Sequence, residues 1–189
     1  MRHPHHSFAY GALIVLVSLL SACTNSYRME PLPIATNASS EVRRMPILKV
    51  GDEVAVALPA DGRYGNTIYT GSGTMTQNAI IGCLREMGVN AREAATEAKP
   101  GVVAPKSWTV TPLILEWEDR ATELSGLPDR IRVELRTTDP AGQLRDATSI
   151  SGASKWATFG GDHPQDMLRP ALLPWAQRIA TDGSAPKKP

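Results

Sequence analysis

The chain has 189 residues, of which 42% are hydrophobic and 21% are charged. This length and composition favour one globular domain and exclude a disordered or fibrous chain. Basic and acidic residues are nearly equal in number, 20 against 19, and the arginines are scattered among acids. Because a nucleic-acid-binding domain needs a basic face, we expect no nucleic-acid partner.

Residues 1–22 predict a signal peptide of the lipoprotein type. Arg2 precedes an apolar run over residues 8–20, which is shorter than the roughly 20 residues of a membrane-spanning helix. The run ends in Leu20-Ser21-Ala22-Cys23, where Leu20 is too large for ordinary signal-peptide cleavage. This tetrapeptide resembles the bacterial lipobox, which implies cleavage before Cys23 and acylation of Cys23. The alternative is a secreted protein in which Cys23 is an ordinary thiol.

Lipidation would make the membrane a partner through Cys23, because each buried methylene of an acyl chain contributes about 0.8 kcal/mol. Thr24, rather than Asp, follows the cysteine and resembles outer-membrane sorting in a Gram-negative cell. We therefore expect an envelope protein, lipid-anchored to the outer membrane and facing the periplasm. Residues 23–48 contain several prolines and predict a flexible linker that holds the domain off the bilayer. Residues 182–189 predict a disordered tail.

Residues 49–181 predict one α/β domain with a β-α-β start. The apolar run at 53–58 is typical of a buried strand, and residues 89–94 predict a second strand. Between them, a helix is expected over 74–87, because apolar side chains recur there at helical spacing. That spacing places Cys83 on the inward face. With Cys23 lipidated, Cys83 has no disulfide partner, and we expect a buried free thiol.

The second half predicts antiparallel strands and one more helix. Strands are expected over 108–117, 130–136 and 143–154, with a type I turn at residues 139–142 and Pro112 marking a bulge or an edge. A final helix is expected over 173–181, with Trp117 and Trp175 in the core. The expected fold is a mixed β-sheet with antiparallel C-terminal hairpins and two helices packed on it.

Four motifs carry a resemblance to a known family. They are residues 60–65 (ADGRYG), 117–120 (WEDR), 125–130 (SGLPDR) and 160–166 (GGDHPQD). Together they resemble a family of small bacterial lipoproteins known as a domain of unknown function. The resemblance implies a lipid anchor and gives no activity. The element order also resembles the small α/β domains of periplasmic assembly lipoproteins, at the level of the fold.

Polar side chains near predicted strand ends form the candidate binding surface. In open α/β sheets, ligands gather outside such ends, and these charges could meet the loop at 160–166 in one polar cleft. The candidates are Asp61, Arg63, Tyr64, Glu116, Asp119, Arg120, Trp156, Asp162, His163 and Asp166. Salt-bridged structural loops are the alternative interpretation.

The residues favour a non-enzymatic protein. His163 is the only histidine after Cys23, and no Gly-x-Ser-x-Gly motif accompanies it, so a hydrolase using His163 is a minor hypothesis. A zinc site would need more His or Cys ligands, and we expect no metal and no cofactor. The Gly71-Ser72-Gly73 stretch could hold an anion at a helix start, but a turn is the favoured interpretation.

The leading hypothesis is a membrane-anchored envelope module that binds another envelope protein or assembles with itself. A small-ligand or glycan-binding lipoprotein is the second hypothesis, because Trp156 and Phe159 stand in a glycine-containing loop where exposed rings could stack on a sugar. Exposed rings in this loop would favour these two hypotheses. A cleft holding His163 with a serine and a carboxylate would favour the hydrolase.

Overall fold

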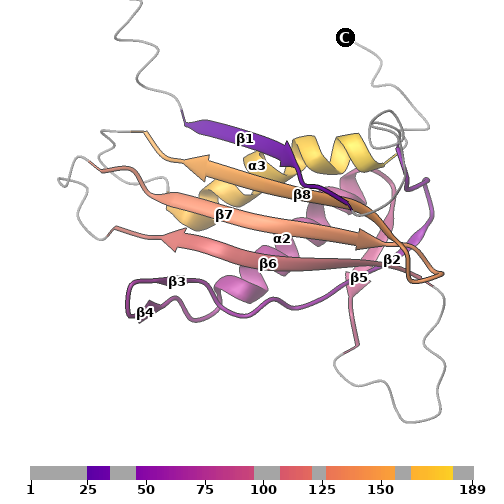
Figure 1. Cartoon of the computed structure of the whole chain (residues 1–189), viewed down its shortest axis with the longest axis horizontal. Coiled ribbons are helices and arrows are strands. Elements are labelled where there is room, and N and C mark those ends of the chain that lie inside the picture. The colour runs from indigo at the N-terminus through magenta and orange to yellow at the C-terminus, as the bar shows by residue number, and fades with distance from the viewer. Residues whose placement is uncertain (1–24, 35–45, 96–106, 121–126, 156–162, 181–189) are drawn as a thin grey trace, which may run out of the picture.

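A six-stranded mixed sheet covered on one face by two helices forms the body of the protein, shown in Figure 1 as a computed structural model. The structure describes residues 25–34, 46–95, 107–120, 127–155 and 163–180. The strand order is β1-β8-β7-β6-β2-β5, and β3 and β4 form a separate hairpin. The predicted fold class is confirmed. The elements are β1 (Ser26–Pro31), β2 (Glu53–Val56), β3 (Arg63–Tyr64), β4 (Thr67–Ile68), α2 (Ser72–Glu86), β5 (Asn90–Glu93), β6 (Trp108–Glu118), β7 (Arg130–Thr138), β8 (Leu144–Ala153) and α3 (Pro164–Ile179).

The β-α-β start is present as predicted. Strand β2 pairs in parallel with β5 and with β6, and α2 connects β2 to β5 across the covered face. Gly88 ends the helix region with φ +76°, a conformation that glycine adopts without steric cost. Cys83 is buried at 1% exposure, and burial raises the pKa of its thiol to about 11. The expectation of a buried free Cys83 is confirmed.

Strands β6, β7 and β8 form the predicted antiparallel half. Pro112 lies where β6 has no strand beside it on the side of β2. Val110 O accepts from Ala57 N at the end of β2, and the backbone N of Pro112, two residues later, points to the same side of β6, beyond the end of β2. The bulge in β6 lies between Ile114 and Glu116. The turn after β7 closes as predicted, with Gly142 N donating to Asp139 O at 2.9 Å.

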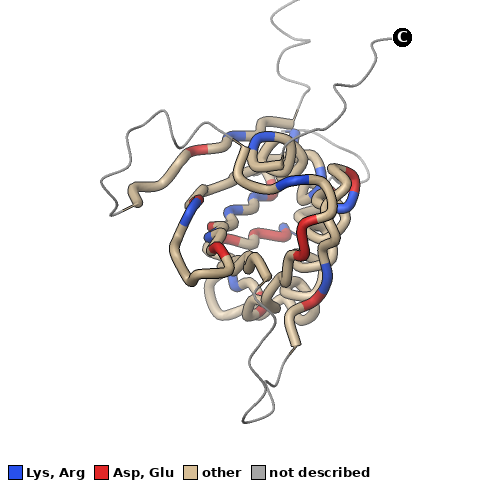
Figure 2. The backbone as a smooth tube through the Cα atoms, turned by 90° about the vertical axis from the view of Figure 1, so that its right-hand side faces the viewer, with Lys and Arg blue, Asp and Glu red and all other residues tan. Residues whose placement is uncertain are grey.

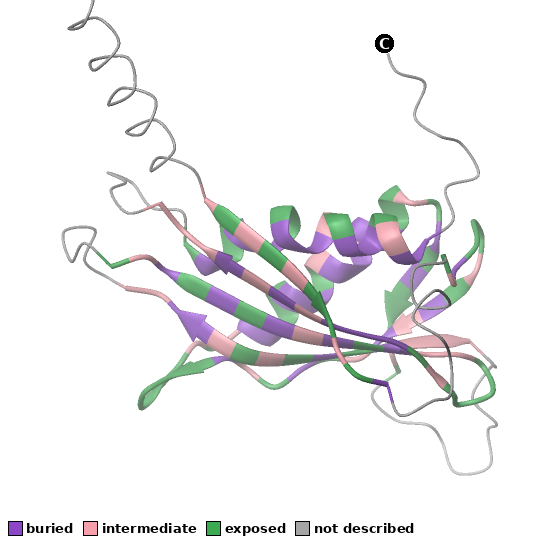
Figure 3. Cartoon of the chain, turned by 45° about the horizontal axis from the view of Figure 1, so that its top comes forward, coloured by how far each residue is buried: buried purple, intermediate pink, exposed green. Residues whose placement is uncertain are grey.

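The core lies between the sheet and the helices. Alternate strand residues and the inner faces of α2 and α3 are buried, whereas the other face of the sheet is open (Figure 3). Trp117 and Trp175 are buried, as predicted, at 2% and 0% exposure. The indole Nε1 of Trp175 donates to Asp146 at 3.2 Å, and Arg178 donates to the other oxygen of Asp146 at 2.8 Å. This buried polar pair fixes α3 against β8.

The expected linker over 23–48 is wrong for residues 26–31. These residues form β1, an edge strand that pairs antiparallel with β8 from Ser26↔Ala153 to Pro31↔Thr148. Tyr27 and Met29 pack against the core, while Ser26, Arg28 and Glu30 are exposed. The stretch thus has the two-residue alternation of a half-buried strand, and its proline is tolerated at the strand end. Residues 35–45, the middle of that linker, lie outside the described residues.

The last helix begins at Pro164 rather than near residue 173. The expected start placed Pro174 in the first turn, where proline is tolerated, whereas Pro170 and Pro174 both lie inside α3, where proline removes a helical hydrogen bond. Both prolines are exposed, so the missing bonds lie on the solvent face. The inward face of α3 buries seven residues against the sheet, and this packing outweighs the helix-breaking preference. They are Met167, Leu168, Ala171, Leu172, Trp175, Ala176 and Ile179.

Candidate functional site

Polar side chains from three separate segments meet where β6 ends. Asp119 and Arg120 follow β6, Asp129 immediately precedes β7, and His163 immediately precedes α3. Ligand atoms of Asp119, Asp129 and His163 all lie within 4.8 Å of one another. We call these three residues the polar cluster. The antiparallel pairing of β6 with β7 brings the first two together, and α3 delivers the third.

His163 and Asp119 form the closest contact of the polar cluster. His163 Nδ1 lies 3.1 Å from Asp119 Oδ1. The hydrogen bond with the Asp119 carboxylate raises the pKa of His163, because it stabilises the imidazolium form. The hydroxyl of Tyr69 donates to the backbone O of Asp119 at 3.0 Å and holds the end of β6 in place.

Asp129 is the buried member, with 9% exposure. One carboxylate oxygen, Oδ1, accepts from the backbone N–H of Arg120 at 2.8 Å. Its backbone is paired with Ser154, whose Oγ accepts from Asp129 N at 2.9 Å. Burial raises the pKa of Asp129, and the nearby Asp119 carboxylate acts in the same direction.

The guanidinium of Arg120 contacts residues outside the polar cluster. Its guanidinium donates to Glu118 at 2.9 Å and to the Tyr64 hydroxyl at 3.1 Å. It also lies 5.3 Å from the centre of the Tyr64 ring, within cation–π range. Tyr64 therefore joins the β3–β4 hairpin to the end of β6, next to the polar cluster.

Asp61 has a different role from the one expected. Its Oδ1 accepts from the backbone N–H groups of Gly73 at 2.8 Å and Gly71 at 3.1 Å, at the start of α2. These bonds, that of Gly73 first, lower the pKa of Asp61. A Cβ on Gly73 would lie 2.4 Å from Pro59 O, so only glycine fits there. The anion that the Gly71-Ser72-Gly73 stretch holds is therefore the chain's own carboxylate.

The remaining candidates do not join the cluster through a described contact. Arg63 is exposed on β3, and Glu116 pairs with Arg132 at 3.6 Å on the open face of the sheet. Asp166 lies in the first turn of α3, where its N–H donates to His163 O. Trp156 and Asp162 lie outside the described residues. Of the predicted surface, the structure thus brings together Tyr64, Asp119, Arg120 and His163.

Asp129 is the residue that sequence reasoning missed. It stands in the SGLPDR motif that carries the family resemblance, directly before the alternating strand at 130–136. That position at a strand start was the available signal. Its meeting with Asp119 depends on the register Glu118↔Arg130, which the sequence pattern does not specify.

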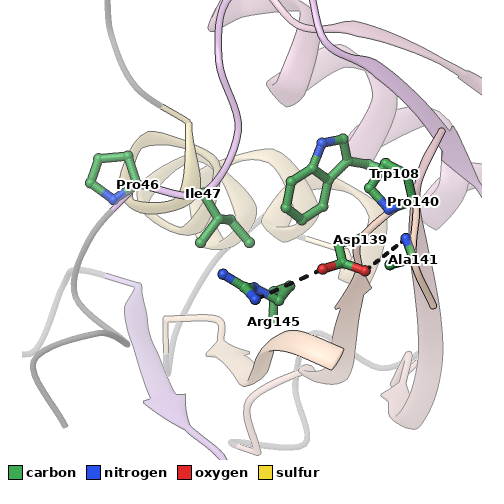
Figure 4. Close-up of a pocket in the computed structure, with 7 residues that line it drawn as sticks. All are labelled: Pro46, Ile47, Trp108, Asp139, Pro140, Ala141 and Arg145. Atoms are coloured by element: carbon green, nitrogen blue, oxygen red, sulfur yellow. Dashed lines mark hydrogen bonds and ion pairs between the residues drawn. The ribbon is translucent and has the colours of Figure 1, made fainter. Parts of the chain in front are cut away.

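Two further surfaces adjoin β6, one at its middle and one at its start. The first, the apolar corner, consists of Tyr64, Ile68, Leu113 and Leu115, each between 42% and 52% exposed, where the β3–β4 hairpin contacts β6. The second, the apolar hollow, has a volume of about 510 Å³ and is lined by Pro46, Ile47, Trp108, Asp139, Pro140, Ala141 and Arg145. In Figure 4 Ile47 and Trp108 flank the hollow above the Arg145–Asp139 pair.

Charge does not gather into one field on the described surface. Basic and acidic residues are interspersed along the chain in Figure 2. On the open face, Arg132 pairs with Glu116 and Arg136 pairs with Glu134. Within the described ranges, no helix is both long and apolar enough to cross a membrane.

This mixed sheet with two helices on one face, and a polar cluster at the end of β6, defines an α/β domain with one open sheet face. The chain belongs to the family described as "Domain of unknown function (DUF4823)", whose model matches residues 47–179. No curated protein matches the chain.

Solved structures share the fold. A PelC dodecamer from Paraburkholderia phytofirmans matches with a TM-score of 0.56 and 16% identity, over 83% of this chain and 99% of that chain. A point variant of PelC from the same organism, also a dodecamer, matches with a TM-score of 0.55 and 17% identity, over 82% of this chain and 99% of that chain. At these identities the likeness concerns the fold.

Proposed function

We propose that this protein is a lipid-anchored module of the cell envelope that assembles with itself through the described domain and catalyses no reaction. The observation that carries the proposal is the fold, which extends over 99% of PelC, a chain that crystallised as a dodecamer. The anchor is proposed from the lipobox-like sequence at Cys23, and Thr24 favours the outer membrane. Another envelope protein as the binding partner remains the alternative within the same class.

The apolar corner and the apolar hollow support a head-to-tail arrangement. They share no residue and adjoin different parts of β6, the corner at Leu113 and Leu115 and the hollow at Trp108, so they are different surfaces. Contact between unlike surfaces of identical chains is heterologous, and it gives a ring when the rotation between neighbours closes. Exposed Tyr64, Ile68, Leu113 and Leu115 would lose contact with water when they enter the hollow of the next copy.

Native mass spectrometry of the detergent-solubilised full chain tests this proposal. We expect an oligomer of the unmodified protein, and dissociation in each of two single variants: Ile68→Lys at the apolar corner and Ala141→Arg at the rim of the hollow. Both positions are exposed, so neither substitution should prevent folding. Val50→Lys is the matched control, because Val50 is 60% exposed and belongs to neither surface.

Mixing the two variants distinguishes the geometry. Each variant keeps one intact surface, so a one-to-one mixture should form a heterodimer if the contact is head-to-tail. A monomeric native protein would contradict self-assembly. An oligomer that both variants leave intact would contradict these two surfaces.

A ligand-binding role is the second candidate function. The observation that favours it is the convergence of Asp119, Arg120, Tyr64 and His163 at one strand end, where ligands gather in open α/β sheets. Screening the protein against envelope glycans by thermal shift would test it, with Tyr64→Ala expected to abolish any shift.

A further inference from the structure

The polar cluster has the composition and spacing of a metal site. It offers one imidazole nitrogen and two carboxylate oxygens, contributed by the end of β6, the start of β7 and the start of α3. In a tetrahedral zinc site with ligands at 2.0–2.1 Å, neighbouring ligand atoms are about 3.3 Å apart. His163 Nδ1 and Asp119 Oδ1 already stand 3.1 Å apart. One ligand atom from each of the three residues lies within 4.8 Å of the other two, so shifts of at most about 1.5 Å would bring three ligand atoms to the corners of a tetrahedron.

Asp129 gives an independent reason to expect a cation. Its side chain is nine-tenths buried, and of its two carboxylate oxygens only Oδ1 accepts a hydrogen bond within the described part of the chain. A buried carboxylate needs a positive partner or a full set of donors. The nearest guanidinium, that of Arg120, is bound to Glu118 and Tyr64 instead. The second Asp129 oxygen is not among the fully enclosed unpartnered atoms, so it is open to a further ligand beside the Asp119 carboxylate.

We propose that Asp119, Asp129 and His163 bind one divalent transition-metal ion, with Zn²⁺ as the representative. Imidazole suits zinc and neighbouring transition metals, whereas magnesium and calcium prefer all-oxygen sites. Three protein ligands leave a fourth position open to water or to a ligand. The proposal differs from the expectation of no metal, because that expectation counted histidines and cysteines and did not place Asp129. It is independent of the proposed self-assembly, which requires no metal.

Isothermal titration with ZnCl₂ tests the site. The probe protein is the metal-stripped full chain in a mild detergent, with Cys23→Ser so that no N-terminal thiol competes. His3, His5 and His6 are replaced by alanine in the same protein, because the uncleaved N-terminus would otherwise offer imidazoles to zinc. The second thiol, Cys83, is buried. We expect one equivalent of Zn²⁺ to bind. Asp129→Asn and His163→Ala should each weaken binding at least 10-fold, the usual effect of losing part of a metal site.

Asp166→Asn is the matched control, since it removes a carboxylate near His163 that is not a member of the cluster. Its affinity should stay within about 3-fold of the parent. His163 is exposed, so His163→Ala keeps the test decisive even if Asp129→Asn does not fold. X-ray absorption at the zinc edge should show a first shell of nitrogen and oxygen ligands without sulfur, together with the outer-shell scattering of one imidazole. No binding, or equal affinity in the His163 variant and the parent, would overturn the proposal, and neither result depends on the oligomeric state.

Discussion

Asp61 shows how one side chain can occupy a site that the sequence offers to a ligand. A Gly-Ser-Gly stretch before a helix predicts exposed N–H groups, and those of Gly71 and Gly73 are indeed aligned. Asp61, ten residues before Gly71, is brought to these N–H groups by the turn at residues 60–65. A search for the glycine motif alone does not reveal this contact. The result is a helix start neutralised from within the chain.

This contact gives a pH-dependent prediction at the residue scale. The folded-state pKa of Asp61 is lowered, so its contribution to stability is complete above the unfolded pKa of about 3.9 and is lost as the pH falls through the folded pKa. Asp61→Asn keeps the accepting oxygen but removes the charge at the start of α2, and should therefore lower the Tm by roughly 1–3 °C at pH 7. The difference from the parent should shrink steadily below about pH 4. Circular dichroism melts over pH 2.5–7 would measure this, and a pH-independent gap would contradict it.

The polar cluster marks the limit of sequence reasoning about single residues. Asp119, Arg120 and His163 were accessible, because charged residues at predicted strand and helix ends gather at one edge of a sheet. The sequence did not predict that Asp61, Glu116 and Asp166 lie apart from the cluster. Glu116 precedes the strand end by two residues and faces the open side of the sheet, where Arg132 pairs with it. Which side chains meet depends on strand register, which is fixed by packing of the whole sheet.

At the scale of elements, the predictions made from regularly spaced hydrophobic residues were confirmed, and those made from the prolines of β1 and α3 were wrong. The helix at 72–86 and the three antiparallel strands follow periodic apolar residues, and packing keeps those patterns. In β1 and α3 the prolines suggested a linker and a late helix start. Pro31 ends a strand at the sheet edge, and Pro170 faces solvent, so both are placed where their missing N–H groups cost little.

Strand β1 can be tested as a structural element. Met29 packs against the core, whereas Arg28 points to the open face of the sheet. Met29→Ala should lower the free energy of unfolding by about 1–2 kcal/mol, less than a fully buried methionine would cost, because Met29 is only partly buried. Arg28→Ala should change it by less than about 0.5 kcal/mol. Urea denaturation measures both values, and a negligible effect of Met29→Ala would show that residues 26–31 contribute nothing to the fold.

At the scale of the whole molecule, the class of fold was predictable and its strand order was not. The β-α-β start and the antiparallel hairpins are consecutive in sequence, so local patterns reveal them. The sheet is completed by β1, which pairs with β8 more than a hundred residues later. No local pattern encodes that pairing, since the two strands are far apart in the sequence and meet only in the folded sheet.

The anchor also belongs to this scale, because it fixes the whole chain in space. Cys23→Ser should abolish labelling by palmitate analogues and leave an uncleaved product, since the acylated atom must be a thiol. Cys83→Ser is the matched control and should keep the label. In-gel fluorescence of the clicked analogue would measure both variants. Persistent labelling of Cys23→Ser would contradict the lipoprotein assignment.

The position of β1 has a consequence for how an acylated protein would meet its own kind. Ser26 already belongs to the sheet, and only Thr24 and Asn25 lie between it and Cys23, so the reach from Cys23 is three Cα–Cα steps, about 11 Å. A lipid on Cys23 would therefore act as a short tether, with the Ser26 end of β1 always nearest the bilayer. Copies would diffuse in the plane of the membrane, and all of them would have the same orientation relative to it. A closed ring built from such copies would lie parallel to the membrane, with every subunit presenting the same end to it.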